Sequence, residues 1–149
     1  MKALIQRVKN ASVTIDGELY SNIGKGLLVF VGVEKEDEKI NAEKLVEKII
    51  NLRVFEDENE KMNFSVKDVC GEILVVSQFT LCGDCKKGTR PSFDKSASLD
   101  KAIELYDYFV DRMSLSGLKI ETGKFRAMMD VALINDGPVT FVLEKSSVD

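Results

Sequence analysis

Small polar side chains gather at the end of one strongly apolar stretch of the chain. Residues 73–76, Ile-Leu-Val-Val, form a continuous apolar run of the kind found in a strand buried on both faces. Ser77 comes next, and alternation along a strand places it on one face with Phe79. Gln78 and Thr80 then lie on the other face. These polar groups can cap the sheet through local hydrogen bonds, or they can deliver polar atoms to a pocket.

A second candidate segment, Asn-Asp-Gly-Pro at residues 135–138, lies between two apolar stretches. Asp136-Gly137 is typical of a two-residue hairpin turn, but Pro138 lacks a backbone donor and fixes its own φ. Glycine tolerates unusual backbone geometry, and a Gly-Pro bond can be cis. Taken alone, the segment predicts an ordinary turn between strands over residues 128–134 and 139–144.

The absence of histidine limits the chemistry. The sequence contains none, which excludes a Ser-His-Asp triad, a Cys-His pair, a histidine general base and a histidine metal cage. We therefore expect catalysis without imidazole, and we expect no cofactor and no metal. The formal net charge of −4 provides no overall positive field, so a nucleic-acid partner must be held by a local basic patch.

Length and composition indicate a soluble globular protein. The chain has 149 residues, of which 44% are hydrophobic and 31% charged, so we expect residues 1–149 to form a single domain. We see no secretory signal and no membrane-length apolar run, so we expect a cytoplasmic protein without membrane contact. Three cysteines, Cys70, Cys82 and Cys85, are an odd number, which favours reduced thiols over a disulfide framework.

The order of predicted elements indicates an α+β domain with a mixed or largely antiparallel sheet and two main helices. A barrel-like closure of the sheet is part of this expectation, although periodicity alone does not establish it. The expected pieces are strands at 2–8 and 12–20 around an Asp16-Gly17 turn, a buried strand at 27–33, a helix over 40–50, a return to the sheet at 51–55, the strand at 72–81, and a helix that begins after Ser96 or Ser98 and stops at Gly117.

The two polar segments together, Ser-Gln-Phe-Thr-Leu at 77–81 and Asn-Asp-Gly-Pro-Val-Thr at 135–140, resemble the two signature motifs of the D-aminoacyl-tRNA deacylases. The resemblance covers essentially the whole chain. Further segments that look like family sequence at family positions are Gln6-Arg7-Val8, Gly26-Leu27-Leu28-Val29, Lys61-Met62-Asn63, Arg90-Pro91-Ser92-Phe93, Tyr106-Asp107-Tyr108-Phe109 and Thr122-Gly123-Lys124-Phe125.

This resemblance implies a homodimeric hydrolase that cleaves the ester joining a D-amino acid, or mischarged glycine, to the terminal adenosine of tRNA. It implies that a cis Gly137-Pro138 bond reaches into the partner subunit's active site and excludes an L side chain sterically. The catalytic residues implied are Ser77, Gln78, Phe79 and Thr80. Their backbone and amide donors can stabilise an oxyanion while the ribose 2′-hydroxyl assists, and Thr80 as a nucleophile is the alternative, although no base is evident for it.

Other residues take roles from the resemblance, each with a simpler alternative. Phe125 and Met129 match positions that lie against the terminal adenine, although both can be core residues. Arg7 matches a position that braces the Gly-Pro segment. A basic patch of Lys86, Lys87 and Arg90 can contact tRNA phosphates or can be a solvated loop.

Two rival hypotheses remain at this stage. Cys82-Gly83-Asp84-Cys85 is a C-x-x-C motif, which suggests a redox or zinc role, but the residues after it do not continue as a helix and only Cys70 and a carboxylate remain as further ligands. Cys82 also departs from the family pattern. The other rival is a non-catalytic RNA-binding module, against which the acidic charge balance argues.

Overall fold

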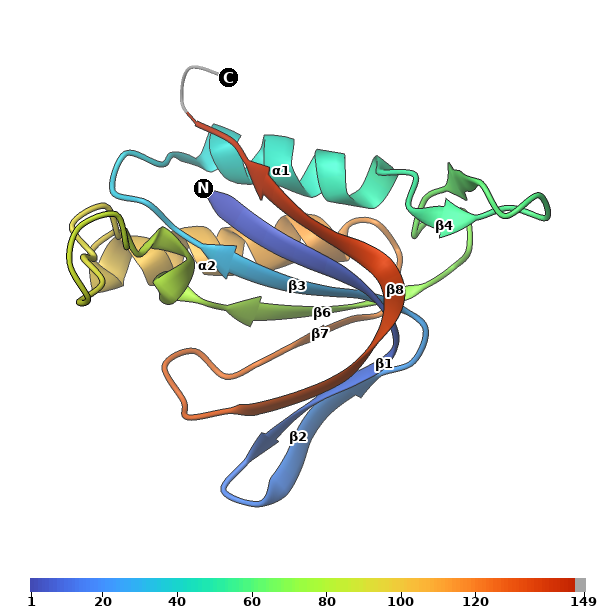
Figure 1. The fold of residues 1–149 in the computed structure, drawn as a ribbon, viewed down its shortest axis with the longest axis horizontal. Coiled ribbons are helices and arrows are strands. Elements are labelled where there is room, and N and C mark those ends of the chain that lie inside the picture. The colour runs from blue at the N-terminus through green and yellow to red at the C-terminus, as the bar shows by residue number, and fades with distance from the viewer. Residues whose placement is uncertain (147–149) are drawn as a thin grey trace.

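One curved sheet of six strands forms the centre of the computed structural model, which describes residues 1–146 (Figure 1). The strands are β1 (Lys2–Ile15), β2 (Glu18–Ile23), β3 (Gly26–Gly32), β6 (Glu72–Ser77), β7 (Ile120–Thr122) and β8 (Asp130–Glu144). Their order is β2-β1-β3-β6-β7, and β8 pairs with β1. Because β1 uses residues 2–6 to pair with both β3 and β8, those two strands lie on its opposite edges.

The amino-terminal hairpin forms at the predicted turn, where Asp16 and Gly17 have φ values of 51° and 79°. The predicted break between residues 8 and 12 was wrong, because β1 continues through it as one strand. The register with β8 is irregular between Gln6 and Asn10, but apolar residues of β1 are buried on both sides of this irregularity. Pairing with β8 resumes beyond it, so β1 remains one strand.

Strand β6 is buried on both faces, as its apolar run predicts. It pairs in parallel with β3 and β7, whereas the other pairs of the sheet are antiparallel, so the sheet is mixed. Ile73 and Val75 belong to the core beneath the helices. Leu74 and Val76 belong to a second core on the concave side of the sheet. The strand is therefore locked by apolar contacts on two sides.

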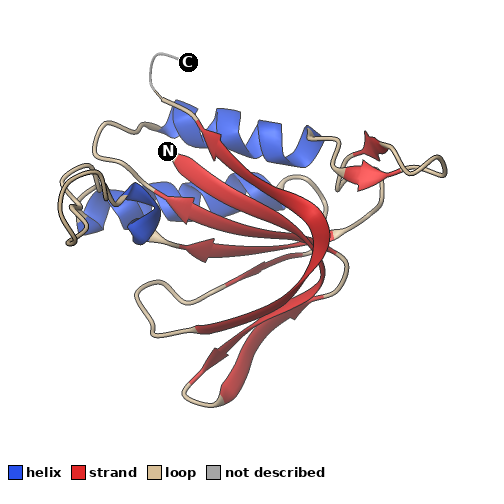
Figure 2. Cartoon of the chain, viewed as in Figure 1, coloured by secondary structure: helices blue, strands red, loops and turns tan. Residues whose placement is uncertain are grey.

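Helices α1 (Lys39–Asn51) and α2 (Leu99–Ser114) lie on the same side of the sheet (Figure 2). Leu45, Ile49, Phe109 and Met113 are fully buried against it. Ser98 caps α2 by accepting a hydrogen bond from the Lys101 N–H at 3.4 Å. The two predicted helices are confirmed. None of the helices described is long and apolar enough to cross a bilayer.

The sheet curls until its ends nearly meet, which confirms the barrel-like α+β expectation. Ser21 on β2 donates from its hydroxyl to the Thr122 carbonyl on β7 at 2.8 Å. Residues 51–55, however, do not return to this sheet. Instead β4 (Phe55–Glu56) pairs with β5 (Met62–Phe64) in a separate two-stranded sheet. The prediction failed because a strand of two residues carries too little periodicity to indicate its partner.

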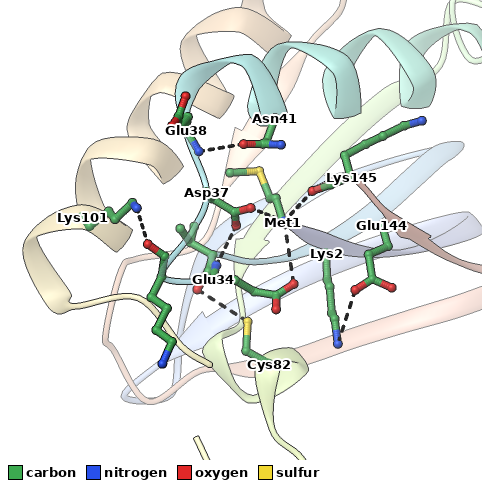
Figure 3. Close-up of polar contacts among 12 residues, drawn as sticks. Met1, Lys2, Glu34, Asp37, Glu38, Asn41, Cys82, Lys101, Glu144 and Lys145 are labelled. Carbon is green, nitrogen blue, oxygen red and sulfur yellow. Dashed lines mark hydrogen bonds and ion pairs between the residues drawn. The ribbon is translucent and has the colours of Figure 1, made fainter. Parts of the chain in front are cut away.

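A polar cluster fixes the start of β1 to the entrance of α1 (Figure 3). The Met1 ammonium donates to Asp37 at 2.5 Å and to the Lys145 carbonyl at 2.7 Å. Asp37 is only 3% exposed and also accepts from the Glu34 N–H at 2.7 Å. The Glu38 N–H donates to the Asn41 side chain at 2.7 Å, which closes the capping arrangement of α1.

Close contact between β3 and β6 gives a test of this packing. A Cβ atom added at Gly26 would lie 1.7 Å from the Glu72 carbonyl oxygen, whereas one at Gly24 would meet only a carboxylate oxygen at 3.4 Å. We expect Gly26→Ala to lower the free energy of unfolding by about 3 kcal/mol, because the two strands must separate. Gly24→Ala is the matched control, and urea denaturation of both measures the difference. Equal stability of the two variants would contradict the packing.

Candidate functional site

Strand β6 ends at Ser77, and the chain then turns into a short 3₁₀ helix, η1 (Phe79–Cys82). The predicted strand over 72–81 was therefore too long, and the alternation expected for residues 77–80 does not apply. The last bond of the strand edge runs from the Gln78 N–H to the Val31 carbonyl at 2.7 Å. Beyond it the chain leaves the sheet, so Phe79 is 58% exposed and packs its ring on Phe93, with 5.2 Å between ring centroids.

Two backbone N–H groups at this turn lack an acceptor within the turn itself. The first internal bond of η1 is donated by the Leu81 N–H to the Gln78 carbonyl at 3.2 Å. The N–H groups of Phe79 and Thr80 precede that bond, so the turn leaves them without an internal acceptor. The Gln78 amide donates to the Thr80 hydroxyl at 2.5 Å. An amide donor cannot take the hydroxyl proton, so this contact holds Thr80 in place without activating it.

A cavity of about 270 Å³ opens beside the turn. Ser77 and Phe79 line it together with Phe125, so the structure brings these predicted residues to one place. The remaining lining residues are Val33, Ser96, Ala97, Leu99, Ala102 and Arg126. The sequence analysis did not predict Arg126 as a lining residue, although its position directly after Phe125 was a signal for it. Its φ of 65° lies in the left-handed region and marks a constrained turn.

Phe125 has contacts on two sides. It lines the cavity, and it also packs against Tyr106 with 5.7 Å between ring centroids. The Tyr106 hydroxyl donates to the Val75 carbonyl at 3.0 Å, and burial raises the pKa of Tyr106 far above its ordinary value. The Tyr106 phenol therefore stays protonated, which excludes Tyr106 as a general base. Its ring instead packs against Phe125. Met129 is half-buried and packs against the concave core.

The second polar segment is a bulge within one strand. Residues 130–144 form the single strand β8, so the predicted hairpin turn at Asp136-Gly137 was wrong. Gln6 pairs with Thr140 and Val8 pairs with Asn135, which leaves Arg7 alone opposite residues 136–139. The extra residues must leave the ladder, and Gly137 and Pro138 are exposed. The Gly137–Pro138 peptide bond is cis.

Arg7 is the support of this bulge. Its side chain is buried, with the residue only 3% exposed, and its guanidinium donates to three carbonyls. These are Asp136 at 3.0 Å, Gly137 at 3.4 Å and Val54 at 2.7 Å. It also forms ion pairs with the Asp136 carboxylate at 3.3 Å and with Glu56 at 3.6 Å. A planar fork of donors suits such a set of acceptors, and a lysine cannot reproduce it.

Asn135 completes the support, and sequence reasoning missed its role. Its side-chain amide donates to the Arg7 carbonyl at 3.1 Å and to the Val139 carbonyl at 3.0 Å. The two bonds join the base of the bulge, which we call its neck, to β1 at Arg7 and to the returning part of β8 at Val139. An asparagine before a Gly-Pro pair was the signal, because its side chain commonly bonds to nearby backbone.

The predicted site residues thus fall into two loci within one chain. Ser77, Phe79 and Phe125 share the cavity, whereas Arg7, Gly137 and Pro138 do not line it. The basic residues Lys86, Lys87 and Arg90 lie exposed in the loop that follows η1.

All three cysteines are free. Cys82 is buried and donates to the Val33 carbonyl at 3.5 Å, and this burial raises the pKa of its thiol. A reactive C-x-x-C thiol has a lowered pKa, so the environment of Cys82 argues against a redox role. Within residues 1–146, no group of three or more Cys, Asp or Glu side chains is arranged to hold a metal ion.

Comparison with known proteins places this geometry in context. Residues 4–144 match the family model described as D-Tyr-tRNA(Tyr) deacylase. The chain is 56% identical to the D-aminoacyl-tRNA deacylase of Thermodesulfovibrio yellowstonii, with 96% of this chain and 98% of that protein covered. It is 54% identical to the D-aminoacyl-tRNA deacylase of Thermotoga petrophila, with 99% of each chain covered.

Two solved structures are also similar. One is a c-Myc DNA unwinding element binding protein, with a TM-score of 0.93 and 45% identity over 99% of this chain and 100% of that chain. The other is a probable eukaryotic D-amino acid tRNA deacylase, with a TM-score of 0.83 over 95% of this chain and 97% of that chain. Its identity is 16%, so this second likeness is one of fold.

The neck of the bulge provides a test. Asn135→Ala removes both bonds that close it, and we expect a loss of about 1–2 kcal/mol in unfolding free energy. Amide hydrogen exchange should accelerate at residues 136–141 and stay unchanged at residues 73–76. Asn63→Ala is the control, because its amide makes one exposed hydrogen bond, to Asp57 at 3.3 Å. Unaltered exchange at residues 136–141 would show that Asn135 does not hold the bulge.

Proposed function

The chain belongs to the D-Tyr-tRNA(Tyr) deacylase family, and from this premise we propose that it hydrolyses D-aminoacyl-tRNA in the cytoplasm. The bond cleaved is the ester between the amino acid and the terminal adenosine, and the products are free tRNA and a D-amino acid. The observation that carries the proposal is the pair of N–H groups of Phe79 and Thr80 that lack an acceptor within the turn, where Ser77 and Phe79 line a cavity and the sequence has no imidazole.

The chemistry suits a site that supplies position and charge stabilisation. An aminoacyl ester is already activated, and the neighbouring ribose 2′-hydroxyl can assist attack by water. The N–H groups of Phe79 and Thr80 and the Gln78 amide stabilise the developing oxyanion. Thr80 acts as a positioning group, because its hydroxyl accepts from Gln78 and the sequence has no histidine to deprotonate it.

The apolar cavity is the place for the terminal adenine. Phe125 offers its ring for stacking, and Tyr106 holds that ring from behind. Met129 lies beside Gly123, where a Cβ would come within 2.7 Å of its sulfur, but it does not line this cavity, so its contact with the adenine stays a prediction of the family resemblance. Exposed Lys86, Lys87 and Arg90 contact backbone phosphates next to this end of the substrate.

A homodimer explains how the two loci form one site. Strand β8 pairs only with β1 among the described residues, so its other edge is unpaired along 15 residues. Ile134, Phe141 and Val142 are 53%, 40% and 69% exposed on it. An edge strand with exposed apolar side chains is a natural surface for a second copy. Pairing there brings Gly137 and Pro138 of one protomer to the partner's cavity.

Selectivity for D-amino acids then follows from the backbone of the bulge. The carbonyls of Gly137 and Pro138 accept from the substrate's α-ammonium and fix its orientation. With the ammonium and the ester held, an L side chain runs into the Gly-Pro backbone while a D side chain points away. Glycine has no side chain to exclude, so mischarged glycyl-tRNA is also a substrate.

Substrate assistance can be tested directly. Wild-type protein should hydrolyse D-Tyr-tRNA and leave L-Tyr-tRNA intact, and Thr80→Ala should retain turnover, reduced about 10- to 100-fold. A D-Tyr-tRNA ending in 2′-deoxyadenosine should react at least about 100-fold more slowly than the normal substrate. Binding of D-Tyr-tRNA without turnover would instead identify an RNA-binding module, and a covalent acyl-enzyme at Thr80 would contradict the mechanism.

The dimer is tested by placing charge on β8. We expect Val142→Glu to convert a dimer into a monomer in sedimentation velocity and to abolish deacylation, because a buried unpaired carboxylate opposes association. Leu115→Glu is the matched control, since Leu115 is 73% exposed at the end of α2. A wild-type monomer with full activity would refute the arrangement.

A further inference from the structure

A groove away from the proposed active site is lined by residues of α1, the segment that follows it and Lys145. The end of β8 runs beside α1 (Figure 1). The groove has a volume of about 510 Å³, and we call it the α1 groove. Its lining residues are Lys44, Glu47, Lys48, Asn51, Leu52, Arg53 and Lys145. None of these residues has a part in the chemistry derived above.

The residues that line the α1 groove carry a net positive charge, whereas the whole chain carries a net negative charge. Four of the seven lining residues are cationic and only Glu47 is acidic, in a chain whose formal net charge is −4. Within residues 1–146, none of the four cations forms an ion pair. Lys48 and Arg53 are exposed, and Arg53 lies near enough to Asp68 to be one of the groups that lower the pKa of that carboxyl. Such a concentration of unpaired positive charge suits a polyanion.

The α1 groove is joined to the bulge through Arg7. Arg53 lines the groove, and the next residue, Val54, offers its carbonyl to Arg7 at 2.7 Å. The same guanidinium holds the Gly137 carbonyl at 3.4 Å. One buried side chain therefore links the Gly137 carbonyl to the residue that follows Arg53 in the chain.

We propose that the α1 groove binds the sugar-phosphate backbone of the tRNA body, away from the aminoacylated end. The proposal rests on the deacylase function and extends it to the rest of the substrate. Lys44 and Lys48 are four residues apart on one helix face, about 6 Å along the axis, which suits successive phosphates of one strand. Arg53 binds a phosphate through its planar fork of donors.

Kinetics with two substrates test the inference. For Lys48→Gln/Arg53→Gln we expect KM for D-Tyr-tRNA to rise about tenfold at physiological salt with kcat unchanged. The slope of log KM against log salt should fall in magnitude by about 1.4–1.8, which is two lost phosphate contacts. Hydrolysis of D-tyrosyl-adenosine, which has no tRNA body, should be unaffected. Glu47→Gln should lower KM for D-Tyr-tRNA roughly twofold, because it removes the one opposing charge.

Lys9→Gln/Lys119→Gln is the charge-matched control, because both lysines are exposed and lie outside the groove. Its KM and salt slope should match those of the wild type. If both double variants change KM and slope equally, the effect is one of net charge and the groove assignment is overturned. If the wild type fails to hydrolyse D-tyrosyl-adenosine and D-Tyr-tRNA alike, the deacylase function itself fails, which distinguishes the two outcomes.

Discussion

One buried guanidinium, that of Arg7, connects the parts of this protein that the proposed reaction needs. It bonds to the carbonyls of Asp136 and Gly137 in the bulge of β8 and to the carbonyl of Val54 beside the α1 groove. Asn135 closes the same bulge from the other side. Carbonyls that leave a strand ladder must find other donors or lose free energy, and here a charged side chain supplies them. The bulge is thus a fixed projection of the sheet.

The end of β6 is a second element that packing holds fixed. Strand β6 is held between two apolar cores, so its end at Ser77 and the donors of the following turn are set by packing. Neither element carries an imidazole, and the Asp136 carboxylate of the bulge is paired with Arg7. A reaction on an activated ester with a neighbouring hydroxyl needs orientation and oxyanion stabilisation, and rigid backbone provides both. Recognition of the tRNA body can then lie on a separate surface without disturbing the chemistry.

Sequence reasoning predicted the elements with strong periodicity and missed those decided by distant pairing. The run at 73–76 indicated a doubly buried strand, and the capping serine and Gly117 indicated the start and end of α2; both elements are present. The Asp136-Gly137 turn was wrong because β1 pairs with β8 on both sides of the bulge, which overrides a local turn signal. The 3₁₀ turn after Gln78 and the contacts of Asn135 depend on partners that no local pattern specifies.

The central claim is that the bulge held by Arg7 completes the site of the neighbouring protomer. Mixing two impaired variants tests it most directly: Arg7→Lys, which loosens the bulge, and Gln78→Ala/Thr80→Ala, which removes the Gln78 amide and the Thr80 hydroxyl from the turn. If sites are shared between protomers, random mixed dimers contain one site built from two intact parts, and deacylation of D-Tyr-tRNA should recover to roughly a quarter of the wild-type rate. No recovery from mixed dimers of confirmed composition would show that each site lies within one chain.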